Sequence, residues 1–427
     1  MDALEIRKVV YPGRSLGYLD GKTCFTDEGL PGETVDVERL KDKPDLIEAR
    51  TVGIRVRSAR RVEPRCDHYS ACSPYQIADY PLQLDLKAGQ LKELLAGLET
   101  DGKKDIGIEP SPLVWEYRNK ARFRILWTAA GPVPAYNRPG RRDSFVPALG
   151  CRLLLPAVRE TVARAVAAAR PLRSCLEDVE VKASSTTGEI LVVLHGRSAP
   201  KPKEVDPLLS AVLENPRIVG IVSLTTRGGN LEERVLWGRR FLDDAFGGAP
   251  VRIGPLSFFQ VNASIQPAVL AEMRGVLKGR KARTLADLYC GVGAFGLALL
   301  PEVETVYAVE SEPEAVSFLK INAARTGSPR FTICDGTAEE WLDWILDRKV
   351  DAVIVDPPRK GLDETVLNGL IARPVPALIY LSCNPSTLAR DLRRLLPAYR
   401  VVSLRGYDFF PQTPHIETLA VLEGVRS

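Results

Sequence analysis

Three residues with reactive side chains fall at the ends of strand-like runs in the last third of the chain: Asp356, Cys383 and Glu417. Asp356 opens "DPPRKG", whose two prolines stiffen the exit from the run and keep it out of a helix. Cys383 stands in "LSCNPSTLARD", where Pro385 blocks continuation of the strand. A cysteine in that place could be packing filler, a metal ligand or a nucleophile, and the glutamate helps to decide between them.

A cysteine and a carboxylate together suit one reaction on a pyrimidine ring. C5 of the ring is a poor nucleophile, but attack of a thiolate at C6 makes an enolate whose C5 can take an electrophilic methyl group. A base must then remove the C5 proton before elimination frees the thiol. We predict Cys383 as the nucleophile and Glu417 as the base. A free thiol has a pKa of about 8.5, so we expect Arg359 or Lys360 to favour the thiolate.

The elements that must position these residues alternate strand with helix from about residue 256 onward. Buried strands are expected at 284–289, 305–310, 331–334, 352–356, 378–383 and 401–404. Helices are expected between them at 294–300, 313–326, 338–346, 364–372 and 386–396. This rhythm predicts an α/β, Rossmann-like doubly wound sheet, in which ligands bind at the carboxyl ends of parallel strands.

A glycine-rich turn joins the first expected strand to its helix in "ADLYCGVGAFGLALL", residues 286–300. Gly291 and Gly293 let the backbone pass close to a ligand, and the helix N-terminus offers free N–H groups. Glu310 ends the next strand, where a carboxylate can accept hydrogen bonds from ribose hydroxyls. NAD and S-adenosylmethionine both contain adenosine, so this turn alone fits either cofactor.

The chain has 427 residues, which is long enough for two or three domains. Residues 1–60 alternate short strand-like runs with Pro-Gly and Asp-Gly turns and predict a small OB-like β-barrel. Residues 61–255 mix strands with a helix expected at 82–98 and predict a central α+β domain, and residues 256–427 form the doubly wound domain. Apolar runs fall short of the ~20 residues that cross a bilayer, so we expect a cytoplasmic protein without membrane contact.

Arginines gather in three runs of the first third of the chain, at 53–65, 117–124 and 137–143, with aromatic residues between them. This pattern favours binding of RNA or DNA over an ordinary solvated surface. Four basic residues alternate along one expected strand and should share a face that meets the nucleic acid: Arg118, Lys120, Arg122 and Arg124.

The motifs taken together resemble the RNA uracil-5 methyltransferase family. The resemblance rests on "FFQVN" (258–262), "DLYCGVGAFGL" (287–297), "DPPRKG" (356–361), "LSCNPSTLARDL" (381–392) and "FFPQTPHIE" (409–417), in the family's order. Residues 1–60 resemble the TRAM domain, an RNA-binding barrel, through "GYLDGKTCFTDEGLPGETVDV". The resemblance implies S-adenosylmethionine as the cofactor and RNA as the substrate, with 23S ribosomal RNA favoured over transfer RNA.

The same resemblance assigns site residues by their positions in the motifs. It implies Cys383 as the nucleophile and Glu417 as the proton acceptor. The implied cofactor-binding positions are Gln260, Tyr289, Gly291, Gly293, Glu310 and Asp356, with Asp335 or its neighbour Thr337 near the adenine. Ala294 departs from the asparagine or threonine of many members, which removes one polar contact.

A cysteine cluster in the central segment resembles the iron–sulfur ligands of the ribosomal branch. Cys66, Cys72 and Cys151 match three of the four ligands, and Tyr75 stands where the third cysteine of the pattern belongs. Because a [4Fe-4S] cluster normally takes four thiolates, a cluster and three plain thiols both remain open from the sequence. Neither Cys24 nor Cys175 has a spacing that favours it as the replacement.

Three rival functions fit part of the pattern. An adenine or cytosine amino-methyltransferase would use the Asp-Pro-Pro turn but leave Cys383 and Glu417 without a role, and an NAD oxidoreductase would have no use for that turn. A catalytically inactive RNA-binding assembly factor has no need for Cys383, Glu417, Asp356 and Gln260 together. The sequence therefore favours the methyltransferase, with transfer RNA as the alternative substrate and no obligate protein partner expected.

Overall fold

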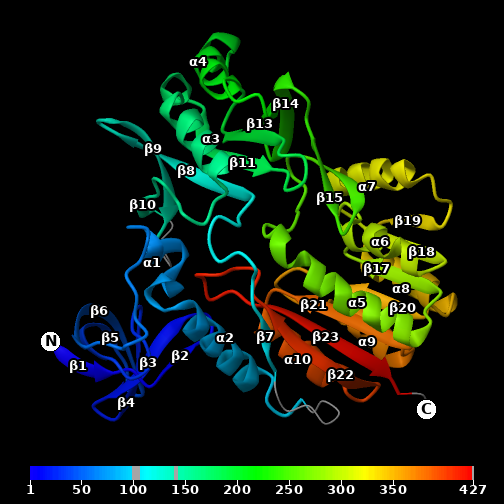
Figure 1. Cartoon of the computed structure of the whole chain (residues 1–427), viewed down its shortest axis with the longest axis horizontal. Coiled ribbons are helices and arrows are strands. Elements are labelled where there is room, and N and C mark those ends of the chain that lie inside the picture. The colour runs from blue at the N-terminus through cyan, green and yellow to red at the C-terminus, as the bar shows by residue number, and fades with distance from the viewer. Residues whose placement is uncertain (99–105, 139–142, 426–427) are drawn as a thin grey trace.

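The fold is given by a computed structural model, which describes residues 1–98, 106–138 and 143–425 (Figure 1). The described residues form three large sheets and a two-stranded one, and the large sheets lie around a central region where α1 (Tyr69–Cys72) and α2 (Tyr80–Leu94) run between them. Within the described residues, every helix is too short or too polar to pass through a bilayer.

The N-terminal sheet has six strands in the order β1-β5-β6-β4-β3-β2 and curls on itself. Its strands are β1 (Asp2–Glu5), β2 (Lys8–Val10), β3 (Arg14–Leu19), β4 (Lys22–Thr26), β5 (Thr34–Asp42) and β6 (Leu46–Val56). Apolar residues alternate along β5 and β6, as at Val35 and Val37, and fill the inside together with Leu4 and Cys24. The alternation that predicts a small barrel therefore matches the curled sheet, which we call the N-terminal barrel.

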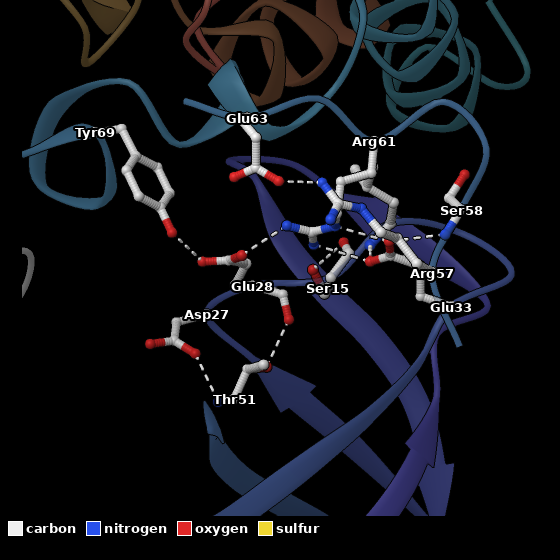
Figure 2. A network of polar contacts seen from close by, with 12 residues as sticks. Ser15, Asp27, Glu28, Glu33, Thr51, Arg57, Ser58, Arg61, Glu63 and Tyr69 are labelled. Carbon is white, nitrogen blue, oxygen red and sulfur yellow. Dashed lines mark hydrogen bonds and ion pairs between the residues drawn. The ribbon is translucent and has the colours of Figure 1, made fainter. Parts of the chain in front are cut away.

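A buried ionic network fastens the barrel to the start of the central segment (Figure 2). Arg61, only 5% exposed, donates to both carboxylate oxygens of Glu33 at 2.7 and 2.9 Å and to Glu28 at 2.8 Å. Tyr69 of α1 donates its hydroxyl to Glu28 at 2.7 Å. Burial acts to raise the pKa of Glu33, but Arg61 and the Leu30 and Ser58 amides hold it below its usual value. The barrel is thus held to the central segment by the ion pairs of Arg61 and to α1 by the Tyr69 hydroxyl.

The central sheet has seven strands in the order β10-β9-β8-β11-β12-β13-β14. They are β8 (Lys120–Thr128), β9 (Gly131–Asn137), β10 (Phe145–Pro147), β11 (Leu176–Ala183), β12 (Ile190–Gly196), β13 (Ile218–Arg227) and β14 (Asn230–Gly238). Helices α3 (Pro156–Ala167) and α4 (Pro202–Leu213) cover it through apolar residues such as Val158 and Leu208. Two pieces of the segment predicted as central belong with the C-terminal part instead. The strand β7 (Ile108–Glu109) joins the C-terminal sheet, and the hairpin β15 (Leu242–Phe246)–β16 (Ala249–Ile253) forms a separate two-stranded sheet that packs against the C-terminal core.

The C-terminal sheet has eight strands in the order β19-β18-β17-β20-β21-β23-β22-β7. The parallel strands are β17 (Thr284–Leu288), β18 (Thr305–Glu310), β19 (Phe331–Asp335), β20 (Ala352–Val355) and β21 (Ala377–Ser382). The last strand, β23 (Glu417–Gly424), is antiparallel and lies between β21 and β22 (Tyr399–Tyr407). This is a doubly wound sheet with one reversed strand, as the strand–helix rhythm predicts.

Both faces of the C-terminal sheet are covered by helices because its central strands are apolar on both sides. Along β21, Ile379 and Leu381 face one core, whereas Leu378 and Tyr380 face the other. The first core takes residues from α5 (Gln266–Arg280), α6 (Ala294–Leu299) and α7 (Pro313–Thr326). The second takes residues from α8 (Ala338–Asp347), α9 (Glu364–Ala372), α10 (Pro385–Leu395) and the end of α2, so α2 links the central segment to this sheet.

Candidate active site

The strand register brings the predicted nucleophile and base side by side. Ser382, the last residue of β21, pairs with Thr418 of β23 in an antiparallel ladder. Cys383 follows Ser382 and Glu417 precedes Thr418, so the two are neighbours at the same edge of the sheet. Asp356 leaves the adjacent parallel strand β20 at this edge. The residues that the sequence places 34 positions apart, Cys383 and Glu417, therefore meet in space.

Cys383 is held at the junction between strand and helix. Asn384 caps α10 by accepting a hydrogen bond from the Ser386 amide at 3.2 Å, and Pro385 occupies the first turn, where its missing N–H costs nothing. Cys383 is one of two half-buried cysteines, the other being Cys72. This junction ends the strand at a defined point and leaves the thiol partly open to solvent.

The Asp-Pro-Pro turn is fastened to the helix that follows the cysteine. The Arg359 carbonyl accepts from the Asn384 side chain at 3.0 Å, and the Lys360 carbonyl accepts from Arg390 at 2.8 Å. The buried carboxylate of Asp391 accepts the Leu362 amide at 3.0 Å. These bonds fix the turn after β20 against α10, so the position of Asp356 is tied to that of Cys383.

The loop at 408–416, which leads from β22 to Glu417, is held by the central segment. Four consecutive carbonyls of this loop, those of residues 409 to 412, each accept a hydrogen bond from a different part of the chain. The donors are the side chains of Asn262 (3.2 Å), Lys87 (3.1 Å) and Tyr117 (3.0 Å) and the amide of Tyr75 (3.1 Å). We call this segment the base loop, because it ends at the predicted base.

A buried ion pair fixes the start of the base loop. Lys87 of α2 donates to Asp408 at 2.6 Å, and both side chains are 0% exposed. Gln83, one turn earlier on α2, exchanges two hydrogen bonds with Gln412, at 2.8 and 2.9 Å. A charge pair out of water holds its geometry because leaving either partner alone is costly. The helix α2 therefore sets the path of the chain into Glu417.

Burial and neighbouring charge shape the acid–base properties of the site. Burial raises the pKa of Cys383 to about 11, the carboxylates of Glu417 and Asp356 act in the same direction, and Arg359 opposes them. Burial, helped by Asp356, raises the pKa of Glu417 well above its usual value. Burial raises the pKa of Asp356 to about 7. Burial therefore opposes ionisation of all three groups, and the thiolate must be favoured by groups that the substrate brings to the site or by Arg359.

We expect the rate of covalent adduct formation to rise about tenfold per pH unit between pH 6 and 9. A thiol with a pKa near 11 is ionised in only a small fraction there, and that fraction grows in proportion to hydroxide. Arg359→Met should slow the step about fivefold at any pH in this range, because one cation that favours the thiolate is lost. Stopped-flow measurement at saturating RNA checks this.

The matched control is Lys360→Met, which removes the adjacent cation. Lys360 lines a separate pocket and is not among the main groups that shift the pKa of the thiol. Its variant should keep the wild-type pH profile of adduct formation. Equal slowing by both variants would show that a general loss of positive charge, and not the position of Arg359, sets the rate.

A pocket of about 250 Å³ lies at the carboxyl ends of β17, β18 and β20. Tyr289, Glu310, Thr337 and Pro358 are among its lining residues. Gly291 has a left-handed backbone (φ +57°), and its amide donates to Glu310 at 2.8 Å. The glycine turn therefore bends beneath the acid at the end of β18, an arrangement suited to a ribose and its adenine.

Two predicted cofactor residues, Asp335 and Gln260, are not among the residues that line this pocket, and their roles stay predictions. Asp335 is outside the set that lines the pocket, and its carboxylate pairs with Lys320 at 2.7 Å, whereas its alternative Thr337 lines the pocket. Gln260 is buried beside Asn119, whose side chain donates to the Gln260 carbonyl at 3.2 Å. Gly293, with φ +88°, is needed for packing, since a Cβ there would stand 2.6 Å from Leu319.

The three cysteines of the central segment do not form a four-thiolate site. Tyr75, at the place of the missing ligand, is buried with its hydroxyl accepting from Gln90 at 2.7 Å. Cys24 belongs to the core of the barrel and Cys175 to that of the central sheet, so neither supplies a fourth thiolate. Across the described residues, no group of three or more His, Cys, Asp or Glu side chains is arranged to hold a metal ion. The iron–sulfur alternative is therefore not supported.

The basic strand face that we expected to meet RNA is already paired with acids. Lys120 contacts Glu180 at 3.1 Å, and Arg122 and Arg124 both contact Asp178 across the ladder between β8 and β11. Arg118 precedes β8 and is partly exposed. The run at 53–65 is similarly paired through Arg61, and part of the run at 137–143 lies outside the described residues. Arg122 and Arg124 remain accessible beside their acidic partners, so contact of this face with RNA stays a prediction.

The residues that hold the base loop are functional candidates that the motifs did not reveal. Lys87, Tyr117 and Asn262 sit in three separate segments, 147 to 323 positions away from the carbonyls they bind. The only local signal was the end of the motif "FFQVN", which contains Asn262.

The sheet order, the glycine turn beneath Glu310 and the Asp-Pro-Pro turn beside Cys383 together define a nucleoside-cofactor methyltransferase. A family model described as tRNA (uracil-5-)-methyltransferase matches residues 251–425. An RNA methyltransferase of Enterococcus faecalis is 30% identical over 98% of this chain and 97% of its own length. One from Gloeobacter violaceus is 32% identical over 95% of this chain and 92% of its own.

The fold agrees with a solved structure along the whole chain. The tRNA (uracil-54, C5)-methyltransferase of Pyrococcus abyssi, solved with S-adenosyl-L-homocysteine, is 24% identical, with a TM-score of 0.78 over 99% of this chain and 100% of that one. The chain belongs to the RNA (uracil-5-)-methyltransferase family. It is therefore an S-adenosylmethionine-dependent RNA methyltransferase.

Proposed function

We propose that the protein methylates C5 of uridine in RNA through a covalent adduct with Cys383. The observation behind this proposal is the register that sets Cys383 beside Glu417 and next to the turn at Asp356. An amino-methyltransferase needs no thiol next to a buried carboxylate at this edge, and neither does an inactive RNA-binding factor.

The proposed reaction passes through a covalent bond between the Cys383 sulfur and C6 of the uracil. The Cys383 thiolate adds to C6, and the C5–C6 π electrons move onto the conjugated carbonyl as an enolate. When bound, S-adenosylmethionine supplies an electrophilic methyl group, which C5 takes as its bond to the sulfonium sulfur breaks. The Glu417 carboxylate removes the C5 proton, the C5–C6 double bond re-forms, and the C6–S bond breaks to return the thiolate.

Residues of the two pockets would hold the substrates. Tyr289 and Glu310 line the pocket of about 250 Å³ and, with Gly291 bound to Glu310, would hold the cofactor there. The target base must leave its stack to expose C5 and C6, so we propose looped or single-stranded RNA as the substrate. A second pocket of about 750 Å³ opens beside the base loop and has Arg14 and Arg50 in its walls, which suits the flanking phosphates.

We propose 23S ribosomal RNA as the first target, because the N-terminal barrel and the cysteine pattern resemble the ribosomal branch. Transfer RNA is the second candidate, because the fold follows a transfer RNA enzyme over 99% of this chain. Nucleoside mass spectrometry of both RNAs from a deletion strain tests the proposal, and we expect one 5-methyluridine of 23S RNA to be lost. Loss in transfer RNA alone would select the second target, and unchanged 5-methyluridine in both would refute the function.

A further inference from the structure

The turn between β2 and β3 of the N-terminal barrel lies directly against the base loop. A Cβ added at Gly13 in this turn would stand 2.8 Å from the Pro414 side chain, so the two segments are in close contact. Pro12 and Gly13 share the walls of the pocket of about 750 Å³ with Pro414 and His415. A segment of the barrel therefore forms part of the surroundings of the predicted base.

The turn is held in this place by α2. Gln90 donates to the Val9 carbonyl at 3.0 Å, and Lys8 pairs with Glu93 at 2.9 Å. The same helix fixes the base loop through Lys87 and Asp408. Because one helix positions both segments, the distance between the turn and the base loop is set by the fold.

Tyr11 is the first residue of the turn, directly after β2. Its ring is half-buried and packs against the core that includes Ile416, the residue before Glu417. Burial raises the pKa of Tyr11, and the charges of Arg359, Cys383 and Glu417 all act on its hydroxyl. Among the described residues, no hydrogen-bond partner of this hydroxyl occurs in the protein.

A hydrogen-bond donor in this place has a defined use in the proposed reaction. Addition of a thiolate at C6 moves negative charge onto the carbonyl oxygen conjugated with C5 and C6. A donor aimed at that oxygen strengthens its bond as the charge develops and so lowers the barrier. A phenol that stays protonated over the working pH range, half-buried and without a partner in the protein, suits this task.

We propose that Tyr11 of the N-terminal barrel is a substrate-contacting residue of the active site, whose hydroxyl donates a hydrogen bond to the uracil carbonyl that takes the enolate charge. This inference rests on the proposed function and assigns the barrel a part in the chemistry in addition to RNA binding. Tyr11 and Cys383, which are more than 350 residues apart in the sequence, would then both contact the same base.

The test is Tyr11→Phe in the full-length protein, with RNA that contains 5-fluorouridine as the probe. Phenylalanine keeps the ring and its packing and removes only the hydroxyl. We expect the rate of covalent trapping to fall about 10- to 100-fold, the effect of one lost bond to a developing charge. The RNA Kd and the S-adenosylmethionine Kd should stay within about twofold of wild type, which a merely structural role would not predict.

The matched control is Tyr18→Phe, because Tyr18 belongs to the same barrel and is 62% exposed. A second variant, Gly13→Ala, places a methyl group against Pro414 and should slow trapping by moving the turn. Trapping by Tyr11→Phe at the wild-type rate, or a parallel loss of RNA affinity, would overturn the assignment of Tyr11. Absence of trapping by the wild-type protein would instead refute the proposed function.

Discussion

Cys383→Ser should lose methylation by about 10⁴-fold or more, and its covalent complex with 5-fluorouridine RNA should disappear. A serine hydroxyl at this position stays protonated at neutral pH, so it cannot add to C6. With 5-fluorouridine, the wild-type enzyme stops after methyl transfer because no proton at C5 can be removed, and the adduct survives denaturing electrophoresis. The measurement is the amount of shifted protein after incubation with RNA and S-adenosylmethionine.

The control for this variant is Cys72→Ser, at the other half-buried cysteine of the chain. Both substitutions exchange one sulfur for oxygen at a similar exposure, so their costs in stability should be comparable. We expect Cys72→Ser to methylate and to be trapped as the wild type is. A serine variant at position 383 that methylates at the normal rate would exclude the covalent route.

Glu417→Gln should stop turnover at a later point than the cysteine variant does. Glutamine keeps the size of the side chain but cannot accept the C5 proton, so the rate should fall about 10²- to 10⁴-fold. Because thiolate addition and methyl transfer precede proton removal, the methylated adduct should accumulate on ordinary uridine RNA. Denaturing electrophoresis with a labelled methyl group detects it, and the label should travel with both protein and RNA.

Glu423→Gln serves as the control, since Glu423 lies at the other end of β23 and pairs with Arg280 and Arg400 on the surface. It should turn over normally and leave no adduct. If Glu417→Gln accumulated no adduct and also lost trapping with 5-fluorouridine RNA, then Glu417 would act before methyl transfer. The two variants therefore order the steps as well as assign the residues.

The pH response of the first step follows from burial. A folded-state pKa of about 11 for Cys383 means that the neutral thiol is the resting form, and that deprotonation must accompany substrate binding. Burial and Asp356 shift the pKa of Glu417 upward as well. Both shifts oppose ionisation, so we expect substrate binding to favour the charged forms of the two residues.

Local patterns predicted the C-terminal sheet well because its strands are runs of residues buried on both faces. The expected strand at 284–289 is β17, Thr284–Leu288, and the expected helix at 313–326 is α7, Pro313–Thr326. The motifs also located Cys383 and Glu417, because each falls next to a strand end that proline or a change of pattern defines.

What the sequence could not predict are pairings between distant segments. The alternation of Arg122 and Arg124 on one face is real, but the acid that pairs with both, Asp178, lies on another strand. The hydrogen bonds that hold the base loop join Lys87 and Tyr117 to carbonyls about 300 residues away, and no periodicity records such contacts. The partner of Asp335 also depended on the tertiary fold, since its carboxylate accepts a hydrogen bond from Lys320 of α7.

The anchoring of residues 409–412 by four separate segments has a consequence for recombination between relatives. A chimaera that takes only the matched portion 251–425 from another member would combine a foreign base loop with this chain's own donors at Tyr75, Lys87 and Tyr117. Such a hybrid can fold its doubly wound half and still leave the glutamate misaligned. We therefore expect an active hybrid only when the segments that carry Tyr75, Lys87 and Tyr117 come from the same parent as residues 251–425.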